Sequence, residues 1–227
     1  MNSGFQRYAV YYLPEDARLV RFGSAWLGWD IESGAMVEQP VVKGADIQAA
    51  TVTPRRYGFH GTLKPPFRLS KDRTAAELEA AVASFAALRS PVAVAGLELD
   101  NLGQFLALVP TGETSCLSGL AFEAVRVLDD FRAPAFASEL QRRRARGLTP
   151  QEDEMLRTWG YPYVGPEFRF HLTLSGRSDP DTLLALKRTA TRLLPPLPQP
   201  YPIASISLVG ERGDGNFQLI QRYDLTG

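Results

Sequence analysis

Residues 55–64 read RRYGFHGTLK, and residues 168–177 read FRFHLTLSGR. Apolar and polar residues alternate in both stretches, which predicts two β-strands. Each stretch contains the order Phe-His-x-Thr-Leu, with the histidine at His60 in the first and at His171 in the second. The protein has 2 histidines in all, and both stand in this motif. We therefore interpret the two stretches as equivalent strands of a duplicated structure.

The order of expected elements around the two motifs also repeats. Strand, helix, strand and strand are expected over 56–109 and again over 168–225. The repeat is too long for a solenoid, so the pattern predicts a duplicated lobe. We predict an α+β fold formed by one bilobal domain over 1–227, with a helical segment at 113–160 between the lobe cores. Two antiparallel sheets should face a central cleft, with the helices outside.

Local signals define the remaining elements. Residues 7–13 read as a strand and residues 17–30 as a helix, followed by a mixed loop over 31–53. Pro65-Pro66 is expected to end the first motif strand. Three helices should begin at capping residues, and a terminal hairpin should follow them. The capping residues are Thr74, Thr149 and Asp179, and the helix that begins at Thr149 should end near Gly160. The hairpin strands are expected at 204–210 and 216–225.

Composition and charge exclude several classes of protein. The chain of 227 residues has 25 basic and 25 acidic side chains, so its formal net charge is zero. A general nucleic-acid or anionic-membrane binder would carry a basic excess. The single cysteine, Cys116, cannot form an intrachain disulfide, which favours a reducing compartment. No apolar run is long enough for a signal peptide or a membrane span, so we expect a cytoplasmic protein without a membrane partner.

The motif geometry points to phosphoryl chemistry. In a strand, His60 and Thr62 share one face, as do His171 and Thr173, while the apolar residues face the other way. The polar faces should therefore point into the cleft between the lobes. Two imidazoles can act as general base and general acid, and hydroxyls can hold the non-bridging oxygens of a phosphoryl group. Histidine suits both roles because its pKa is close to neutral pH.

Weaker candidates lie around the motifs. By strand alternation, Lys64 and Arg169 are expected on the cleft face as phosphate-binding residues, with a solvated charge as the alternative. Tyr8 and Tyr12 share a face of the first strand and could line the cleft, with Tyr8 as a candidate phosphate-binding residue, although strand aromatics are more often core residues. Loop packing is favoured over a pocket-capping role for Tyr161 and Tyr163, and a solvated helical face for the basic run 142–146.

The two motifs resemble the paired HxT signatures of the two-histidine (2H) phosphoesterase superfamily. The wider set RYAVYYLP, RFGSAWLGWD, FHGTLKPPF, GYPYV and FRFHLTLSGR resembles a branch of that superfamily encoded near phosphonate-utilisation genes (DUF1045-like). The resemblance implies a bilobal fold and a metal-independent phosphodiesterase without a cofactor. It also implies catalytic roles for His60 and His171, and phosphate-binding roles for Thr62 and Thr173.

Two other functions stay open at this point. A metal-dependent hydrolase would also gather histidines, although neither motif contains an acidic residue. A non-enzymatic protein could bind nucleotides or phosphorylated metabolites in the same cleft. The expected ligand is a small phosphorylated molecule, such as a cyclic nucleotide or a sugar cyclic phosphate, and an RNA terminus is not excluded. The sequence indicates no obligate protein partner and does not decide which histidine is the base.

Overall fold

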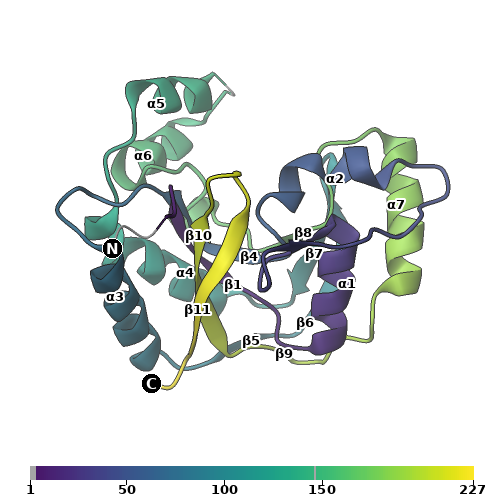
Figure 1. Ribbon diagram of the computed structural model, residues 1–227, viewed down its shortest axis with the longest axis horizontal. Helices are drawn as coiled ribbons and strands as arrows, with labels where there is room; N and C mark the ends of the chain where they lie inside the picture. The colour runs from purple at the N-terminus through teal and green to yellow at the C-terminus, as the bar shows by residue number, and fades with distance from the viewer. Residues whose placement is uncertain (1–3, 146) are drawn as a thin grey trace.

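Seven strands form one continuous antiparallel sheet in the order β11-β10-β1-β4-β8-β7-β6 (Figure 1). The computed structural model describes residues 4–145 and 147–227. Helices cover the sheet, so the predicted α+β class with antiparallel strands is confirmed. The strands are β1 (Tyr8–Tyr12), β4 (Gly61–Phe67), β6 (Gly96–Leu102), β7 (Phe105–Thr111), β8 (Leu172–Thr173), β10 (Ser205–Glu211) and β11 (Phe217–Asp224). Two-stranded sheets pair β2 (Trp29–Asp30) with β3 (Ala35–Met36), and β5 (Val92–Val94) with β9 (Tyr201–Ile203).

The large sheet consists of two halves that meet at the motif strands. Strand β4 begins inside the first motif, directly after His60, and β8 inside the second, directly after His171, so both start later than the expected strands 55–64 and 168–177. The two strands are joined by the single residue pair Gly61↔Leu172. One half is β11-β10-β1-β4 and the other is β8-β7-β6. The two lobes are thus halves of one sheet, whereas the sequence suggested two separate sheets facing each other.

The two halves exchange hairpins. Helix α3 (Ala75–Ala87) follows β4 in the chain and packs against β10 and β11. Helix α7 (Pro180–Leu193) follows β8 and packs against β6 and β7. Each half therefore combines a motif strand and its helix with the hairpin from the other repeat. The prediction that 56–109 and 168–225 form the cores of separate lobes is wrong for this reason.

Strand β4 runs through Pro65 and Pro66 to Phe67, although we expected the prolines to end it. A strand tolerates proline at an edge or a bulge, where no ladder hydrogen bond is lost. Both conditions hold here. Strand β8 pairs with β4 only at Gly61, and the pairing of β4 with β1 shifts register on either side of Val10.

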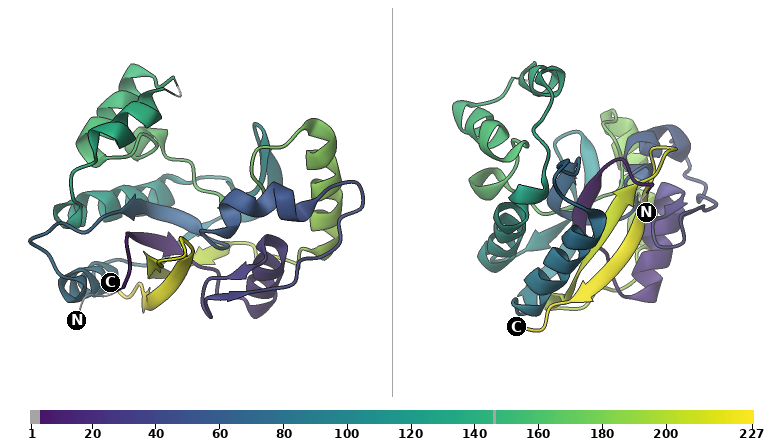
Figure 2. Two further views of the ribbon diagram at one scale, coloured as in Figure 1. Left: turned by 45° about the horizontal axis from the view of Figure 1, so that its top comes forward. Right: turned by 60° about the vertical axis from the view of Figure 1, so that its left-hand side comes forward.

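The helices mostly begin at the expected capping residues. The capping boxes at Thr74 and Thr149 are present, and Asp179 caps α7. The remaining helices are α1 (Ala17–Leu27), α2 (Ile47–Arg55), α4 (Ser115–Val127), α5 (Ala137–Arg144) and α6 (Pro150–Trp159), which ends at Gly160 as expected. Helix α2 was missed, because residues 31–53 were expected to form a loop. Helices α5 and α6 form a pair that projects from one half of the molecule (Figure 2).

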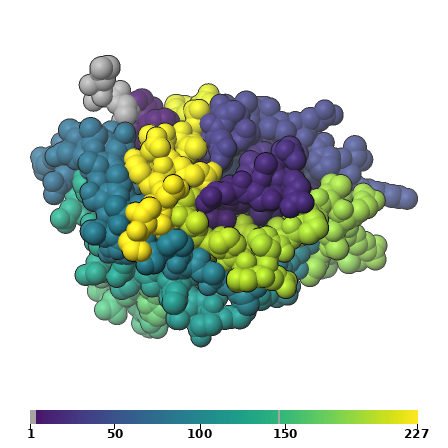
Figure 3. Space-filling model, turned by 90° about the horizontal axis from the view of Figure 1, so that it is seen from below, coloured from purple at the N-terminus to yellow at the C-terminus, as the bar shows by residue number. Residues whose placement is uncertain are grey.

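Strand β1 separates two apolar clusters. Tyr8, Val10 and Tyr12 belong to the main core, while Tyr11 belongs to a smaller cluster on the other face together with Phe217. The main core extends under helices α3, α4 and α7. On the face seen from below, the C-terminal strand lies between α3 and α1 (Figure 3). No helix among the described residues has both the length and the apolar character needed to cross a bilayer.

Candidate active site

A phenylalanine precedes each motif histidine, and each packs against a glycine. The ring of Phe59 occupies the space where a side chain at Gly23 of α1 would stand. The ring of Phe170 does the same at Gly61, inside the first motif. Both rings are buried in the main core. These contacts anchor the backbone just before each strand and so fix where the two histidines emerge.

The imidazole of His60 is held by two hydrogen bonds. Its Nδ1–H donates to the carbonyl oxygen of Gly58 at 2.9 Å, since a carbonyl can only accept. In the neutral ring Nε2 is then the acceptor, and the Thr62 hydroxyl donates to it at 3.0 Å. This pair of bonds fixes both the tautomer and the orientation of the ring.

His171 repeats the first of these contacts. Its Nδ1–H donates to the carbonyl oxygen of Arg169 at 2.7 Å, again two residues earlier in the chain. Its Nε2 has no hydrogen-bond partner among residues 4–145 and 147–227, and the same is true of the Thr173 hydroxyl. Both imidazoles therefore present Nε2, the atom that can accept or donate a reacting proton.

An aromatic ring lies beside each histidine. Tyr11 stacks on His60 with 3.7 Å between ring centroids and 20° between planes, and Phe105 lies 5.5 Å from His171. Tyr11 reaches His60 because it pairs directly with Thr62 across β1 and β4, which places both on one face. Sequence reasoning selected Tyr8 and Tyr12 instead, which lie on the opposite face of β1 from Tyr11. Tyr8 lies in the main core, so its prediction as a phosphate-binding residue is wrong.

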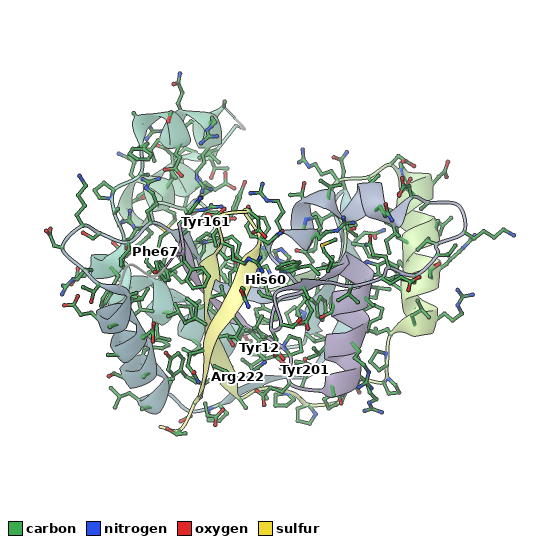
Figure 4. The ribbon with its side chains drawn as sticks, in the orientation of Figure 1. Tyr12, His60, Phe67, Tyr161, Tyr201 and Arg222 are labelled. Atoms are coloured by element: carbon green, nitrogen blue, oxygen red, sulfur yellow. The ribbon has the colours of Figure 1, made fainter. Side chains whose placement is uncertain are left out.

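Two adjacent pockets open at the motifs. The first, of about 470 Å³, contains His60, Thr62 and Thr173, and the second, of about 400 Å³, contains Thr62 and His171. Both volumes are typical of small-molecule sites. Thr62, Pro65 and Tyr161 line both pockets, so the two spaces adjoin at the motifs. In the view of Figure 4, Tyr161 lies between α6 and His60.

The linings of the two pockets differ in character. The first is polar and cationic, and its further lining residues are Arg7, Tyr11, Tyr57, Pro65, Pro66, Glu139, Arg142, Arg143 and Tyr161. The second is mainly apolar, and its further lining residues are Leu63, Pro65, Leu102, Gly103, Phe105, Tyr161, Tyr163, Val164, Glu167, Phe168 and Arg169. Arg169 thus lies in the second pocket, beside His171. Sequence reasoning missed Arg7 and Phe105, because only the strand pairing brings them to the motifs. It placed Tyr57 among the apolar residues facing away from the cleft, but Tyr57 lies in the turn before β4 and does not follow the strand alternation.

Burial makes both imidazoles less basic. Desolvation lowers the pKa of His60 to about 4, against a smaller opposing effect of the Gly58 carbonyl, and the charge of His171 lowers it further. Burial also lowers the pKa of His171, opposed by the Arg169 carbonyl. The unliganded site therefore holds two neutral imidazoles at neutral pH. Burial raises the pKa of the Tyr11 hydroxyl, so the ring beneath His60 stays neutral as well.

Lys64 does not face the pockets. Its side chain is only 2% exposed, and its Nζ donates to the Val125 carbonyl at 3.0 Å and lies 3.6 Å from Asp129. Thr62 pairs with Tyr11 but Lys64 pairs with Val10, so β4 has one extra residue between them. This bulge reverses the alternation of side chains. The prediction that Lys64 binds phosphate on the cleft face is therefore wrong.

Three features that the sequence explained as packing or solvated charge line the pockets. Tyr161 and Tyr163 contact each other edge to face at 5.6 Å between centroids, and both line the second pocket. In the basic run, Arg142 and Arg143 line the first pocket, while Arg146 lies outside the described residues. Within those described residues, no three His, Cys, Asp or Glu side chains form a cluster that could hold a metal ion.

A family model described as "Protein of unknown function (DUF1045)" matches residues 62–218, which is more than half of the chain. The chain belongs to the DUF1045 family. The resemblance to the DUF1045-like branch is therefore confirmed.

Two curated relatives extend the DUF1045 match, and both are named ribose 1,5-bisphosphate phosphokinase PhnN. The protein from Janthinobacterium sp. (strain Marseille) is 34% identical over 196 residues, or 83% of this chain and 43% of the relative. The protein from Laribacter hongkongensis (strain HLHK9) is 37% identical over 180 residues, or 76% of this chain and 40% of the relative. The chain thus spans less than half the length of these relatives.

Among solved structures, the DUF1045 chain is similar to TT0787 of Thermus thermophilus. The two share 17% identity over 97% of this chain and 98% of that one, with a TM-score of 0.45. It is also similar to E. coli LigT complexed with 3'-AMP, with 16% identity over 98% of this chain and 99% of that one, and a TM-score of 0.42.

Proposed function

We propose that the chain is a metal-independent phosphodiesterase that opens a cyclic phosphate by paired-histidine acid–base catalysis. The observation that carries the proposal is the matched hydrogen bonding of the two imidazoles. His60 and His171 each donate Nδ1–H to the carbonyl two residues before, which leaves Nε2 as the ring nitrogen for proton transfer in both. Such a duplicated arrangement supports two complementary proton-transfer groups around one phosphoryl group.

The proposed reaction is a hydrolysis. A water oxygen attacks phosphorus, and one imidazole accepts the water proton at Nε2. The bond from phosphorus to one ester oxygen breaks, and the other imidazole donates its Nε2 proton to that oxygen. The product is a phosphate monoester with a free hydroxyl. The Thr173 hydroxyl, and the Thr62 hydroxyl once it has turned away from His60 Nε2, donate hydrogen bonds to the non-bridging oxygens as charge develops on them.

The environment of the two rings supports a division of roles. The pKa of His60, at about 4, keeps this ring neutral, and Thr62 already donates a hydrogen bond to its Nε2. A neutral imidazole is suited to act as base once the Thr62 hydroxyl turns from Nε2 to the bound phosphate and frees the lone pair. We assign His60 as general base and His171 as general acid. A bound phosphate anion would raise the pKa of His171 and so favour its protonated form.

The printed names of the two relatives supply a substrate class. Opening a cyclic phosphate that bridges the first and second oxygens of a ribose would release a ribose 1-phosphate. A ribose 1,5-bisphosphate phosphokinase acts on a compound of this type. We extend the proposal to cyclic phosphates of ribose derivatives and to a link with phosphonate metabolism. The kinase activity itself is not proposed for this chain, which contains no G-x-x-x-x-G-K-[ST] sequence.

A turnover screen tests the proposal. Cyclic phosphate esters of ribose and of nucleosides would be incubated with the protein in EDTA, and products followed by phosphorus NMR. We expect hydrolysis that survives the chelator and is lost in the His60→Ala/His171→Ala variant. Turnover that EDTA abolishes and zinc or manganese restores would favour a metallohydrolase. Tight binding without turnover, equal in wild type and variant, would favour a binding protein.

A further inference from the structure

Helix α5 lies over the first pocket without belonging to the core. None of its residues is buried. Polar contacts hold it in place. Arg68 donates to Glu139 at 2.9 Å and stacks on Phe136 at 3.7 Å, and Arg144 pairs with Asp153 of α6 at 2.6 Å. Apolar packing therefore does not explain its position over the pocket.

The last turn of α5 carries three consecutive arginines with different surroundings. Arg144 points to Asp153 and lines neither of the two pockets. Arg142 and Arg143 both line the first pocket. Within residues 4–145 and 147–227, neither of them forms an ion pair with a carboxylate. Arg143 instead lies over the ring of Tyr161 at 4.8 Å, at the junction of the two pockets.

The other charged groups of this pocket are already paired. Arg7 makes two hydrogen bonds with Glu211, at 2.6 and 2.7 Å. Glu139 accepts a hydrogen bond from Arg68. Partial burial disfavours the charged form of Glu139, but this bond lowers its pKa and keeps it ionised. Arg142 and Arg143 are thus the arginines of the first pocket that form no salt bridge among the described residues, although the charge of Arg143 also contributes to the lowered pKa of Glu139. In a chain with zero formal net charge, the pocket has a local excess of positive charge.

We propose that Arg142 and Arg143 form a subsite for a second phosphate group, a terminal monoester carried by the same substrate whose cyclic phosphate is opened at His60 and His171. The proposal rests on the proposed function for the position of the cyclic phosphate. The pocket joins the arginines to His60, Thr62 and Thr173 within one space of about 470 Å³. Arginine pairs with phosphate oxygens through two parallel N–H donors, which gives strength and orientation.

A binding measurement tests the subsite without any turnover. Adenosine 2′-phosphate and adenosine 2′,5′-bisphosphate serve as product-like probes that differ only in the second phosphate. By calorimetry, we expect the second phosphate to tighten binding to the wild type on the order of 10- to 100-fold, as charge-assisted contacts to two arginines would. In Arg142→Ala/Arg143→Ala we expect that advantage to fall to about threefold or less.

Matched controls separate the subsite from general effects. Arg144→Ala removes one charge from the same turn and should keep the full advantage of the bisphosphate. Arg142→Gln/Arg143→Gln preserves helix propensity and should lose the advantage, as the alanine variant does. The core is not involved because α5 has no buried residue. Equal advantages in the wild type and both double variants, or no advantage in the wild type, would overturn the proposal.

A kinetic arm distinguishes failure of the subsite from failure of the proposed function. Adenosine 2′,3′-cyclic phosphate would be compared with its 5′-phosphorylated form. If the arginines govern the binding difference but neither cyclic ester is hydrolysed, the subsite stands and the diesterase function fails. If both esters are hydrolysed with equal kcat/KM and the binding difference is absent, the diesterase stands and the subsite is refuted.

Discussion

The ring of Phe170, from the second motif, lies against Gly61, from the first, and takes the space where a β-carbon would stand. Gly61 is also the residue of β4 that pairs with β8, opposite Leu172. The contact explains the one difference between FHGTL and FHLTL. Where the two motifs meet, one must be small so that the aromatic ring of the other can pass.

Replacing Gly61 by alanine should therefore disturb both motifs at once. We expect Gly61→Ala to lower the free energy of unfolding by about 1–3 kcal/mol, the usual cost of overpacking a core. Turnover should fall as well, because His60 precedes the displaced residue. Urea denaturation and steady-state kinetics measure the two effects. Gly119→Ala is the matched control, since Gly119 lies in α4 with open space around it. This variant should raise the free energy of unfolding by about 0.5–1 kcal/mol.

The pH dependence of kcat/KM should follow the two lowered histidine pKa values. The base must be neutral, so activity should fall on the acid side as His60 protonates near pH 4. The acid must be protonated, so activity should also fall as pH rises through the pKa of His171, which lies below 6.5. A bell with an acidic optimum follows. His60→Ala should flatten the acid limb and His171→Ala the alkaline limb, and the reverse pattern would exchange the two roles.

Loss of Lys64 should leave catalysis intact and change stability. Burial lowers the pKa of Lys64 from 10.5 to about 8. Between these values the unfolded chain holds a proton that the folded chain has lost, so the free energy of unfolding should rise with pH across this window, by up to about 3 kcal/mol. Lys64→Met should remove that rise and keep kcat/KM. Denaturation curves of the variant and the wild type at pH 7.5 to 10.5 measure this rise in the free energy of unfolding. A large loss of turnover in the variant would show that Lys64 belongs to the active site.

Tyr11 should act through the orientation of His60. Tyr11→Leu removes the stacked ring and frees the imidazole to tilt, and we expect kcat to fall on the order of 10-fold, because misplaced catalytic groups are costly. Tyr11→Phe keeps the ring and should retain most of the activity. The pKa of His60, followed by NMR, should move toward its ordinary value in Tyr11→Leu only. Equal kinetics in both variants would show that Tyr11 contributes to packing only and does not orient His60.

The sequence predicted those parts of the structure that depend on local patterns. The capping boxes at Thr74 and Thr149 are short-range signals, and both are present in the structure. Both motifs also lead into strands, but these begin at Gly61 and Leu172, after the histidines, and not at residues 55 and 168 as expected. Errors arose where long-range pairing decides. A single bulge after Thr62 turns Lys64 into the core, and the register of β1 places Tyr11, instead of Tyr8, beside His60.

Glycine was also misjudged from the sequence. By intrinsic propensity Gly23 disfavours a helix, yet it lies inside α1. Its role is to admit the ring of Phe59, a residue far along the chain. Propensity scales cannot register such a contact because it is formed only by tertiary packing. The same limitation hid the pocket-facing role of Arg142 and Arg143, which look like any solvated charge run.

The exchange of hairpins between the two halves has a consequence for folding and for the origin of the chain. Neither half can be completed from one repeat, since each motif strand and its helix pack with a hairpin supplied by the other repeat. A single ancestral repeat would satisfy these contacts by trading hairpins with a second copy, as in domain-swapped dimers. The present chain has the architecture of such a dimer fused into one polypeptide. Cutting the chain between the repeats should therefore yield two fragments that are unfolded alone and regain structure only when mixed.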